Sequence, residues 1–375
     1  MATEEWVKHR VVIVGGGVAA LEAALALRQL APDRTLCTVI APNQEYVVRA
    51  QTVRAPFAFP EADHHPVAPI VEAAGATLLV DALERVDTQA QVVVTRGGEQ
   101  LHYDSLILAL GAAPRERYEH ALTVNSHTIQ PVLEEVLAAV DAGEIQDIAF
   151  VTPTGPSWPL PNYELAYMTA RRAREQGIRL NTTLITPEDE PLSLFGAEAS
   201  RTISRLLEDG GVHVMTSSEA EVPSEREVLV SPGQRRLRVD RVLALPELLG
   251  PNIPGVPADQ YGFVPVDEHG RVKGRPGVYA VGDVAAHRIK HGGFAAQQAD
   301  AAAQMIAAAA GADVEAEPVD RVLRGMFITG GDPIYVSVRF EGGHAWDSVV
   351  TSEPTVDPQH KVSARYLTEY LDRVA

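Results

Sequence analysis

The most constraining feature of the chain is the stretch VVIVGGGVAALEA near its N-terminus. A fully apolar run, Val11–Val14, indicates a buried parallel strand, and glycines then lead into a helix predicted over Val18–Leu30. Gly15 permits a tight turn, Gly17 leaves room where the backbone approaches a phosphate, and Ala20 lets helix and strand pack closely. The N–H groups of the helix N-terminus would face that phosphate. This spacing predicts a dinucleotide-binding β-α-β unit.

The same pattern returns later in the chain. A second strand at Leu36–Ile40 completes the first unit, and three strand-like runs (LLVDALERVD, QVVVTRGG and QLHYDSLILALG) then predict a meander, with Gly97-Gly98 as a turn signal. The second unit is predicted from strands at Ile148–Val151, Thr182–Thr186 and Val212–Thr216, helices at Asn162–Gln176 and near Ala197–Asp209, and a meander at about 226–245. The chain therefore carries a loose internal repeat.

This repeat predicts an α/β fold with two Rossmann-like, three-layer nucleotide-binding domains, each with an inserted β-meander, plus a small C-terminal α+β unit. The first domain is predicted to be discontinuous, because a later glycine-aspartate motif belongs with the N-terminal turn. Its predicted bounds are 1–118 and 255–312, those of the second domain are 119–254, and the C-terminal unit covers 313–375.

The end of the chain, VSARYLTEYLDRV, has apolar side chains at helical spacing: Val362, Tyr366, Leu367, Tyr370 and Leu371. A helix that lies on a membrane favours a basic polar face, and this one is mixed. We therefore predict that it packs against the body or against a second subunit. Peripheral membrane contact and a homodimer stay open at this stage.

The composition excludes several classes of function. A net charge of -18 disfavours binding to nucleic acid and to anionic lipid. Cys37 is the only cysteine, which excludes an internal disulfide framework and a mechanism that needs two protein thiols. We find no signal peptide, no run long enough to span a membrane and no metal-ligand cluster, and the twelve histidines are scattered. These features predict a cytoplasmic protein that binds no metal.

A second motif, GVYAVGDVAA, follows the second unit. Its apolar strand ends in Gly282-Asp283. An aspartate at such a strand end can place its carboxylate against a hydroxylated chain such as ribityl, and the alternative is an ordinary helix N-cap.

Taken in order, GxGxxA, YDSLILALGAAPR and GVYAVGD resemble the FAD-binding signature of the pyridine nucleotide-disulfide oxidoreductase superfamily. EYVVRAQTV and KHGGFAAQQADAAAQMIA are most similar to the sulfide:quinone oxidoreductase and type II NADH dehydrogenase branch. The resemblance covers roughly residues 8–345. Its motifs are specific for FAD binding and for the fold, not for a substrate.

The resemblance implies a set of cofactor-binding residues: Gly15, Gly17, Val18, Ala19, Ala20, Ala41, Pro42, Arg49, Ala109, Gly111, Gly282, Asp283, Gly293 and Phe294. Gly292 to Phe294 would open a helix aimed at the flavin pyrimidine edge, and Lys290 would add positive charge there. The alternative for Lys290 is an ordinary solvated lysine. The acidic residue usual at the end of the second strand is missing at Ala41; Glu45 could replace it or be a solvated loop carboxylate.

The second unit departs from the family pattern at its own strand-to-helix turn, FVTPTGPSWPLPNYELA. Its four prolines supply no N–H donors for phosphate, and Trp158 occupies space that a pyrophosphate needs. Glu164 matches the acidic residue that closes the family's helix motif, and Glu188 follows the next strand. We predict that this unit keeps the fold and has lost or drastically altered dinucleotide binding. Trp158 would line the substrate side of the flavin, or be a packed surface aromatic.

The sequence thus predicts an FAD-dependent oxidoreductase that passes electrons from an unidentified small-molecule donor through flavin to an acceptor such as a quinone, without redox-active cysteines. The candidate catalytic residues are Lys290, Glu164 and Trp158. Two alternatives are an NAD(P)H:quinone oxidoreductase and a non-catalytic flavin-binding redox sensor.

Overall fold

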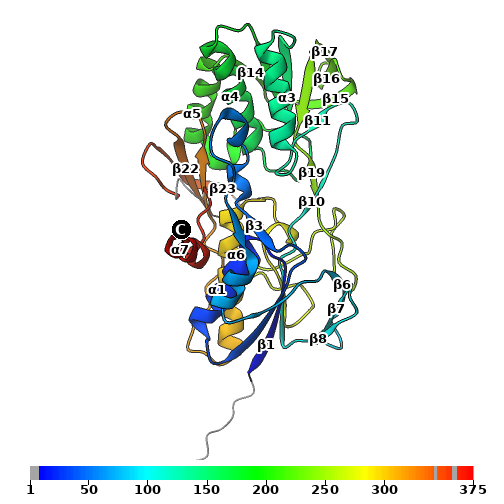
Figure 1. Cartoon of the computed structure of the whole chain (residues 1–375), viewed down its shortest axis with the longest axis vertical. Coiled ribbons are helices and arrows are strands. Elements are labelled where there is room, and N and C mark those ends of the chain that lie inside the picture. Colours follow the sequence, from blue (N-terminus) through cyan, green and yellow to red (C-terminus); the bar gives the residue numbers. More distant parts are fainter. Residues whose placement is uncertain (1–7, 342–343, 357–360, 375) are drawn as a thin grey trace, which may run out of the picture.

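A computed structural model describes residues 8–341, 344–356 and 361–374 of the chain. Two α/β units lie one above the other in Figure 1, and the C-terminal elements lie along one side of both. An antiparallel pair, β10 (Ala113–Arg115) and β19 (Glu247–Leu249), marks where the chain passes between the units.

The first unit is built on a five-stranded parallel sheet in the order β20-β9-β1-β2-β5. The strands are β1 (His9–Val14), β2 (Thr35–Ile40), β5 (Thr77–Leu79), β9 (Ser105–Leu108) and β20 (Val278–Ala280). Because β20 comes from far later in the sequence and pairs with β9, this sheet is discontinuous in the chain, as predicted.

Side chains alternate in direction along the strands, so each face of the sheet packs against a different layer and the unit has three layers. Val11 and Ile13 face a core shared with α1 (Val18–Leu30), α2 (Val67–Ala73) and α6 (Gly292–Ala309), while Val12 and Val14 face the meander on the other side. That meander is β6 (Leu83–Asp87), β7 (Val92–Thr95) and β8 (Gln100–His102). Both faces of the sheet are covered, which explains why β1 is apolar throughout.

The second unit repeats this plan with a parallel sheet in the order β11-β18-β12-β13-β14. Ile148 and Phe150 face the helices, whereas Ala149 and Val151 face the meander. The strands are β11 (Leu122–Thr123), β12 (Asp147–Val151), β13 (Asn181–Ile185), β14 (Val212–Met215) and β18 (Arg241–Ala244); the helices are α3 (Ile129–Asp141), α4 (Leu160–Glu175) and α5 (Ala197–Asp209); the meander is β15 (Glu219–Ser224), β16 (Glu227–Ser231) and β17 (Arg235–Arg238). The predicted fold class is therefore confirmed, and the domain bounds stay a prediction.

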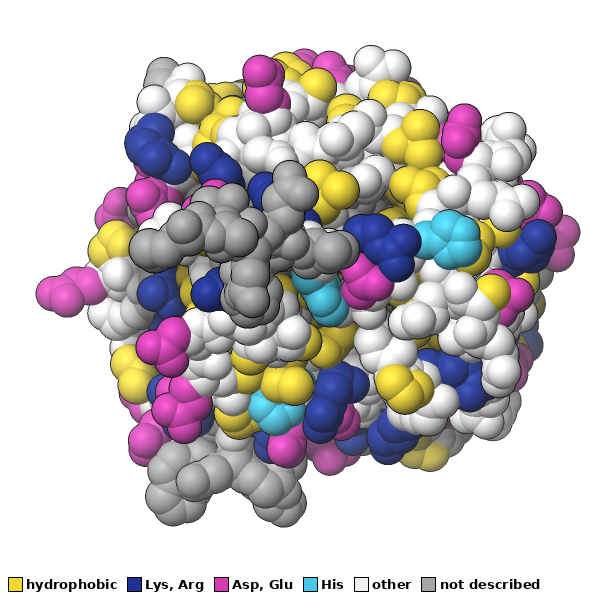
Figure 2. Space-filling model, turned by 90° about the horizontal axis from the view of Figure 1, so that it is seen from below, with side chains coloured by type: hydrophobic (Ala, Val, Ile, Leu, Met, Phe, Trp, Pro, Cys, Tyr) yellow, Lys and Arg dark blue, Asp and Glu magenta, His cyan; other side chains and the backbone are white. Residues whose placement is uncertain are grey.

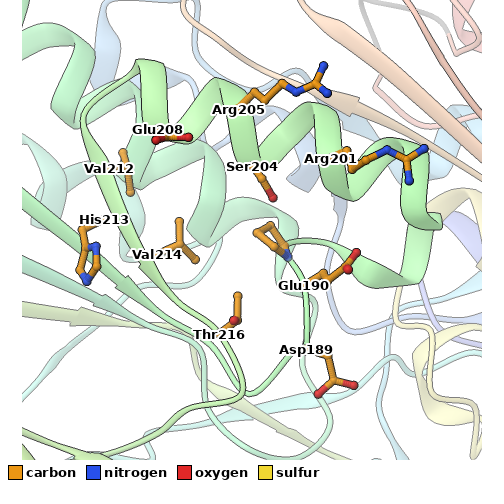
Figure 3. A pocket seen from close by; sticks show the side chains of 11 residues that line it. Asp189, Glu190, Arg201, Ser204, Arg205, Glu208, Val212, His213, Val214 and Thr216 are labelled. Carbon is orange, nitrogen blue, oxygen red and sulfur yellow. The ribbon is translucent and has the colours of Figure 1, made fainter.

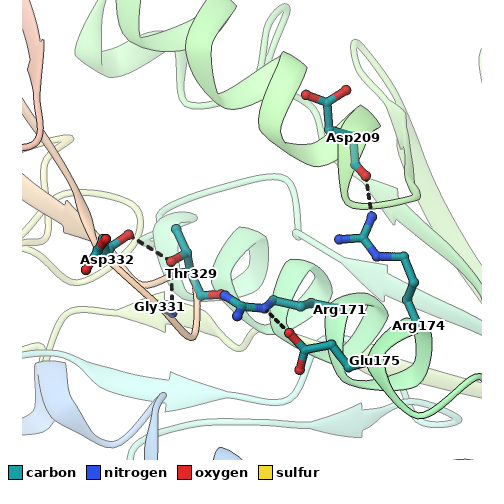
Figure 4. A network of polar contacts seen from close by, with 7 residues as sticks. All are labelled: Arg171, Arg174, Glu175, Asp209, Thr329, Gly331 and Asp332. Carbon is teal, nitrogen blue, oxygen red and sulfur yellow. Dashed lines mark hydrogen bonds and ion pairs between the residues drawn. The ribbon is translucent and has the colours of Figure 1, made fainter.

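The C-terminal elements join the two units. The antiparallel strands β21 (Val322–Phe327), β22 (Ile334–Glu341) and β23 (His344–Thr351) contribute Leu323 and Phe327 to the core of the second unit. In Figure 4, Arg171 of α4 donates to the carbonyl of Thr329 at 2.8 Å, which ties the loop after β21 to that unit. The last helix, α7 (Arg365–Val374), instead buries Leu367 and Leu371 in the core of the first unit, as predicted for packing against the body.

Some predicted boundaries are wrong, for local reasons. The run LLVDALERVD covers two strands, β5 and β6, because the chain leaves the parallel sheet at Asp81, whose carboxylate accepts the N–H of Ala82 at 2.7 Å. QLHYDSLILALG likewise covers β8 and β9, and the end of the second predicted meander is β18 of the parallel sheet. Helix α4 begins at Leu160, earlier than predicted, since proline is tolerated in a first helical turn.

Two negative findings apply to the described residues alone. Within them, no helix is long and apolar enough to cross a membrane. The same part of the chain holds no group of three or more His, Cys, Asp or Glu side chains arranged to bind a metal ion. On the face shown in Figure 2, Lys and Arg side chains are interspersed with Asp and Glu, so this face presents no extended basic patch.

Candidate functional site

The residues predicted to bind a cofactor gather at the carboxyl edge of the first parallel sheet. They follow four neighbouring strands: Gly15 to Ala20 after β1, Ala41 and Pro42 after β2, Ala109 and Gly111 after β9, and Gly282 and Asp283 after β20. This edge is where open α/β sheets bind their ligands. Of the remaining predicted residues, Arg49 is exposed, and the Phe294 side chain is buried in the core.

Two glycines of the first turn differ in the space around them. Gly15 has a φ of +138°, and a Cβ on it would lie 2.2 Å from the carbonyl oxygen of Ala109, so only glycine lets the turn pack on the end of β9. A Cβ on Gly17 would meet nothing within 4 Å, and the same holds for Gly111. Gly17 is the N-cap of α1, so open space lies beside backbone N–H groups that have no acceptor inside the helix.

Asp283 brings an unpaired carboxylate to the same edge. It belongs to the short 3-10 helix η4 (Gly282–Val284) and is half-buried. Its carboxylate accepts no hydrogen bond from the part of the chain that the structure describes. Burial raises the pKa of Asp283, and the charges of Lys290 and Arg49 oppose that shift. A crowded but solvent-reachable acceptor without a protein partner is suited to a hydroxylated ligand.

Two buried side chains hold the turn that carries Asp283. Lys290 donates to the carbonyls of Asp283 and Ala285 at 2.8 and 2.7 Å and lies 3.6 Å from the centroid of the Phe263 ring. Gln298 of α6 accepts the N–H of Gly282 at 2.7 Å. Lys290 is only 4% exposed, so the alternative interpretation, that it is an ordinary solvated lysine, is wrong. Burial lowers the pKa of Lys290 to about 8. Its contact with a flavin stays a prediction.

The end of β2 offers no acidic side chain. Ala41 is buried, and its Cβ would lie 3.1 Å from a Cβ on Gly16, so these small residues let the turn approach β2. Glu45 is exposed in β3 (Glu45–Val47) and pairs with His64 of β4 (His64–Pro66) at 3.1 Å, which favours its interpretation as a solvated carboxylate. The open helix N-terminus and the free Asp283 carboxylate nevertheless fit the pyrophosphate and ribityl parts of FAD.

The corresponding turn of the second unit, between β12 and α4, is longer and packs on β19. Gly155 has a φ of +116°, and a Cβ on it would lie 2.9 Å from Oε1 of Glu247, a residue only 5% exposed that pairs with Arg115. The carbonyl of Pro156 accepts the N–H of Leu248 at 2.8 Å, so the turn lies on β19. A buried carboxylate therefore lies beside this turn, and the loss of dinucleotide binding there stays a prediction. Glu188 is also engaged, since it accepts the Tyr163 hydroxyl at 2.7 Å.

Trp158 lies between the second unit and the N-terminus of α6. Its ring centroid is 4.9 Å from that of His291, the N-cap residue of α6, and 6.0 Å from that of Phe195. Burial lowers the pKa of His291 to about 4, and the charge of Lys361 adds to this shift. Nδ1 of His291 is buried and makes no hydrogen bond. Trp158 is thus partly buried in an aromatic cluster, and its contact with a flavin or substrate stays a prediction.

Glu164 has a partner that the sequence did not reveal. Its carboxylate is fully buried and accepts Lys361 Nζ at 2.6 and 2.8 Å, along with the N–H of Ile328 at 2.8 Å. Burial raises the pKa of Glu164 and lowers that of Lys361; the charge of Arg54 lowers the latter further. The pair joins α4 to the C-terminal segment at the side of the Trp158 cluster.

Glu22 was also missed, although a signal for it exists. It is the fifth residue of α1, as Glu164 is the fifth residue of α4, so the two are equivalent in the internal repeat. Glu22 is fully buried and accepts the N–H groups of Tyr366 and Leu367 at 2.9 and 2.6 Å. An alignment of the two helix starts would have singled out both glutamates.

A surface hollow of about 580 Å³ lies elsewhere, beside α5 and the edge strand β14 (Figure 3). Its lining mixes both charges: Asp189, Glu190 and Glu208 with Arg201 and Arg205. No residue that the sequence singled out lines it, and we assign it no role.

A family model described as pyridine nucleotide-disulphide oxidoreductase matches residues 9–138 and 163–304. The sulfide-quinone reductase of Aquifex aeolicus is 28% identical over 224 residues, which cover 54% of this chain and only 48% of that protein. The NADH dehydrogenase-like protein MT1860 of Mycobacterium tuberculosis is 27% identical over 303 residues, covering 75% of this chain and 74% of that protein.

Solved structures show the same fold. The sulfide:quinone oxidoreductase of Aquifex aeolicus superposes with a TM-score of 0.83 at 18% identity, covering 92% of this chain and 86% of that one. A ferredoxin reductase of Rhodopseudomonas palustris reaches 0.67 at 17% identity, covering 88% and 83%.

Proposed function

Because the chain belongs to the pyridine nucleotide-disulphide oxidoreductase family, as its motifs predicted, we propose that it is an FAD-dependent oxidoreductase. It would pass electrons from a small-molecule donor to an acceptor such as a quinone, without redox-active cysteines. FAD, when bound, would supply the group that accepts and returns two electrons. One observation carries the proposal. The carboxyl edge of the first sheet holds both the uncrowded helix N-cap at Gly17 and the unpaired Asp283 carboxylate.

The chain's own contribution would be binding and orientation. The N-terminus of α1 would donate N–H groups to the pyrophosphate, and Asp283 would accept hydrogen bonds from hydroxyl groups. Lys290 and Gln298 hold the backbone of the Asp283 turn from the inside, so the residue that carries the carboxylate is positioned before the ligand arrives. Preorganisation of this kind lowers the entropic cost of binding.

The single cysteine argues against a sulfur relay. Cys37 is 6% exposed in β2, and burial raises the pKa of its thiol to about 11. A thiol that stays protonated and covered at neutral pH is neither a good nucleophile nor a sulfur carrier. The proposed activity is therefore independent of protein thiols, whatever chemistry the name of the Aquifex relative implies for that protein.

The donor is proposed not to be a nicotinamide dinucleotide bound at the second unit. The Glu247 carboxylate packs against Gly155, and the prolines of the turn remove N–H donors. The Mycobacterium relatives carry names that point to NADH, so NADH is the obvious donor to test.

Two measurements test the proposal. Purified protein should show a flavin absorption spectrum, and anaerobic titration with NADH or NADPH should bleach it slowly or not at all, while a quinone should reoxidise chemically reduced protein. A colourless protein that takes up no FAD would refute the flavoprotein assignment. Rapid, saturable bleaching would show that a nicotinamide binds and would establish the NAD(P)H:quinone alternative. Flavin that no quinone reoxidises would favour the redox sensor.

A further inference from the structure

The C-terminal strap, defined as residues 361–374, is fastened to both α/β units by the two equivalent glutamates. At its start, Lys361 donates to Glu164 of α4. Further on, the first-turn N–H groups of α7 donate to Glu22 of α1. Both glutamates have no exposed surface. The internal repeat has thus placed one buried carboxylate under each end of a single short segment.

Between these two anchors the strap lies on the N-terminus of α6. A Cβ on Gly292 would lie 3.2 and 3.3 Å from the two methyl carbons of Val362, and a Cβ on Gly293 would lie 3.4 Å from the carbonyl oxygen of Ser363. His291, which packs on Trp158, is the residue immediately before. The strap therefore covers the end of the helix that borders the candidate site.

The anchor at Glu22 contains a second carboxyl group. Asp300 of α6 lies within hydrogen-bonding reach of Glu22, and its Oδ1 is buried without a partner. Two carboxyl groups can share a hydrogen bond only while one of them holds a proton. Burial raises the pKa of Glu22 as well, but the backbone N–H groups at the N-terminus of α7 oppose that shift by favouring the charged form, so we assign the shared proton to Asp300. Burial and the Glu22 charge raise the pKa of Asp300 to about 8.

Other charged and titratable groups around this pair are few. Arg365 of α7 acts on Asp300 and lowers its pKa, opposing the larger effect of burial. Tyr366 of α7 and Tyr46 of β3 also face the pair, and burial, with the Glu22 charge added, raises the pKa of both tyrosines. Glu369 of α7 also acts on Tyr366, and Arg49 acts on Tyr46. Because both tyrosines have raised pKa values, the charge that changes near neutral pH belongs to the Asp300–Glu22 pair.

We propose that the C-terminal strap is a lid latched by the proton on Asp300, and that loss of this proton sets Asp300 against Glu22, releases α7 from α1 and uncovers the N-terminus of α6. The docked strap holds the proton more tightly than the released one, in which Asp300 returns to water. Docking is therefore strongest at acid pH and weakens as the pH rises from about 4 to about 8, by at most about tenfold per pH unit. This inference holds whatever the electron donor is.

The experiment is hydrogen exchange of the α7 amides, which reports docking without any turnover. After correction for the intrinsic exchange rate, protection of the Tyr366 and Leu367 amides should fall on the order of tenfold or more between about pH 6 and about pH 8. Asp300→Asn supplies a carboxamide that donates to Glu22 at every pH, so its protection should not depend on pH. Glu369→Gln, at an exposed position of the same helix, is the matched control and should behave as the parent protein does.

Two outcomes would overturn the proposal: constant corrected protection in the parent protein, or a pH dependence that persists in Asp300→Asn. If that variant fails to fold, tryptic cleavage of the parent protein at the exposed Arg365, normalised to a peptide substrate, decides the question. Cleavage should accelerate as the pH rises toward about 8, and a flat profile would overturn the latch.

Discussion

The turns that precede α1 and α4 join equivalent strands and helices but differ at the helix N-cap. The first turn ends at the N-cap Gly17, where a Cβ would meet nothing within 4 Å, whereas the second ends at the N-cap Pro159, which has no N–H. Both lead into helices that bury a glutamate at their fifth position. The comparison teaches that the repeat has the same architecture and a buried glutamate in both copies, while the turns differ, and we propose that only the first binds a phosphate.

The largest expected effect comes from filling the open turn. Gly17→Val should abolish FAD binding and give colourless protein, because the branched side chain would take the space beside the free N–H groups of α1. Folding should be unaffected, since the position has no close neighbours. Flavin content and the far-UV spectrum are measured together, with Ser157→Val in the turn before α4 as the control that should keep its flavin content. A fully yellow Gly17→Val protein would contradict the distinction between the two turns.

The next largest effect tests the anchor of α4. Glu164→Ala leaves Lys361 buried without its partner, so the free energy of unfolding should fall by about 3–5 kcal/mol. The double variant Glu164→Leu with Lys361→Met should recover most of the loss, because it removes both charges together. Denaturant unfolding measures both. Equal destabilisation of the single and double variants would mean that the ion pair is not the cause.

A pH effect should distinguish the Trp158 cluster from the Asp300 latch. His291 has its pKa lowered to about 4, so the unfolded chain binds a proton in the range where the native protein does not. The His291 contribution is therefore present above about pH 6.5 and is lost as the pH falls toward about 4, by up to about 3 kcal/mol. Thermal unfolding of His291→Gln should show a smaller loss of stability over that acid range. If His291→Gln loses as much stability in acid as the parent protein does, a group other than His291 causes the loss.

The smallest effect is expected at Cys37. Cys37→Ala removes one sulfur from the core near β2, so unfolding should become easier by roughly 1 kcal/mol, while flavin content and turnover should not change. Steady-state kinetics and denaturant unfolding measure the two quantities. A large loss of turnover with normal flavin content would reopen a sulfur-transfer mechanism.

What the sequence could predict was local. The bounds of α1, Val18–Leu30, agree with the structure, because a glycine turn and a helical apolar period mark both of its ends. The sequence could also place the residues that follow β1, β2, β9 and β20 at one edge of the sheet, because the carboxyl ends of parallel strands lie at the same edge. The pairing of Glu164 with Lys361 could not, because it joins residues far apart in sequence, and Lys361 lies in a polar stretch without periodicity. The sequence also does not reveal that the carboxylate of Glu247 packs against the turn before α4, because the two are far apart in the chain.

The discontinuity of the first sheet has a consequence for synthesis. Strand β20 is made after the whole second unit, so β9 stays an unpaired apolar edge while that unit emerges from the ribosome. Contacts of such long sequence separation form late, and an exposed edge strand invites pairing with other chains in the meantime. Asp283 follows β20 closely, so the carboxyl edge of the first sheet can be completed only after the whole second unit, with its proline-rich turn, has been synthesised.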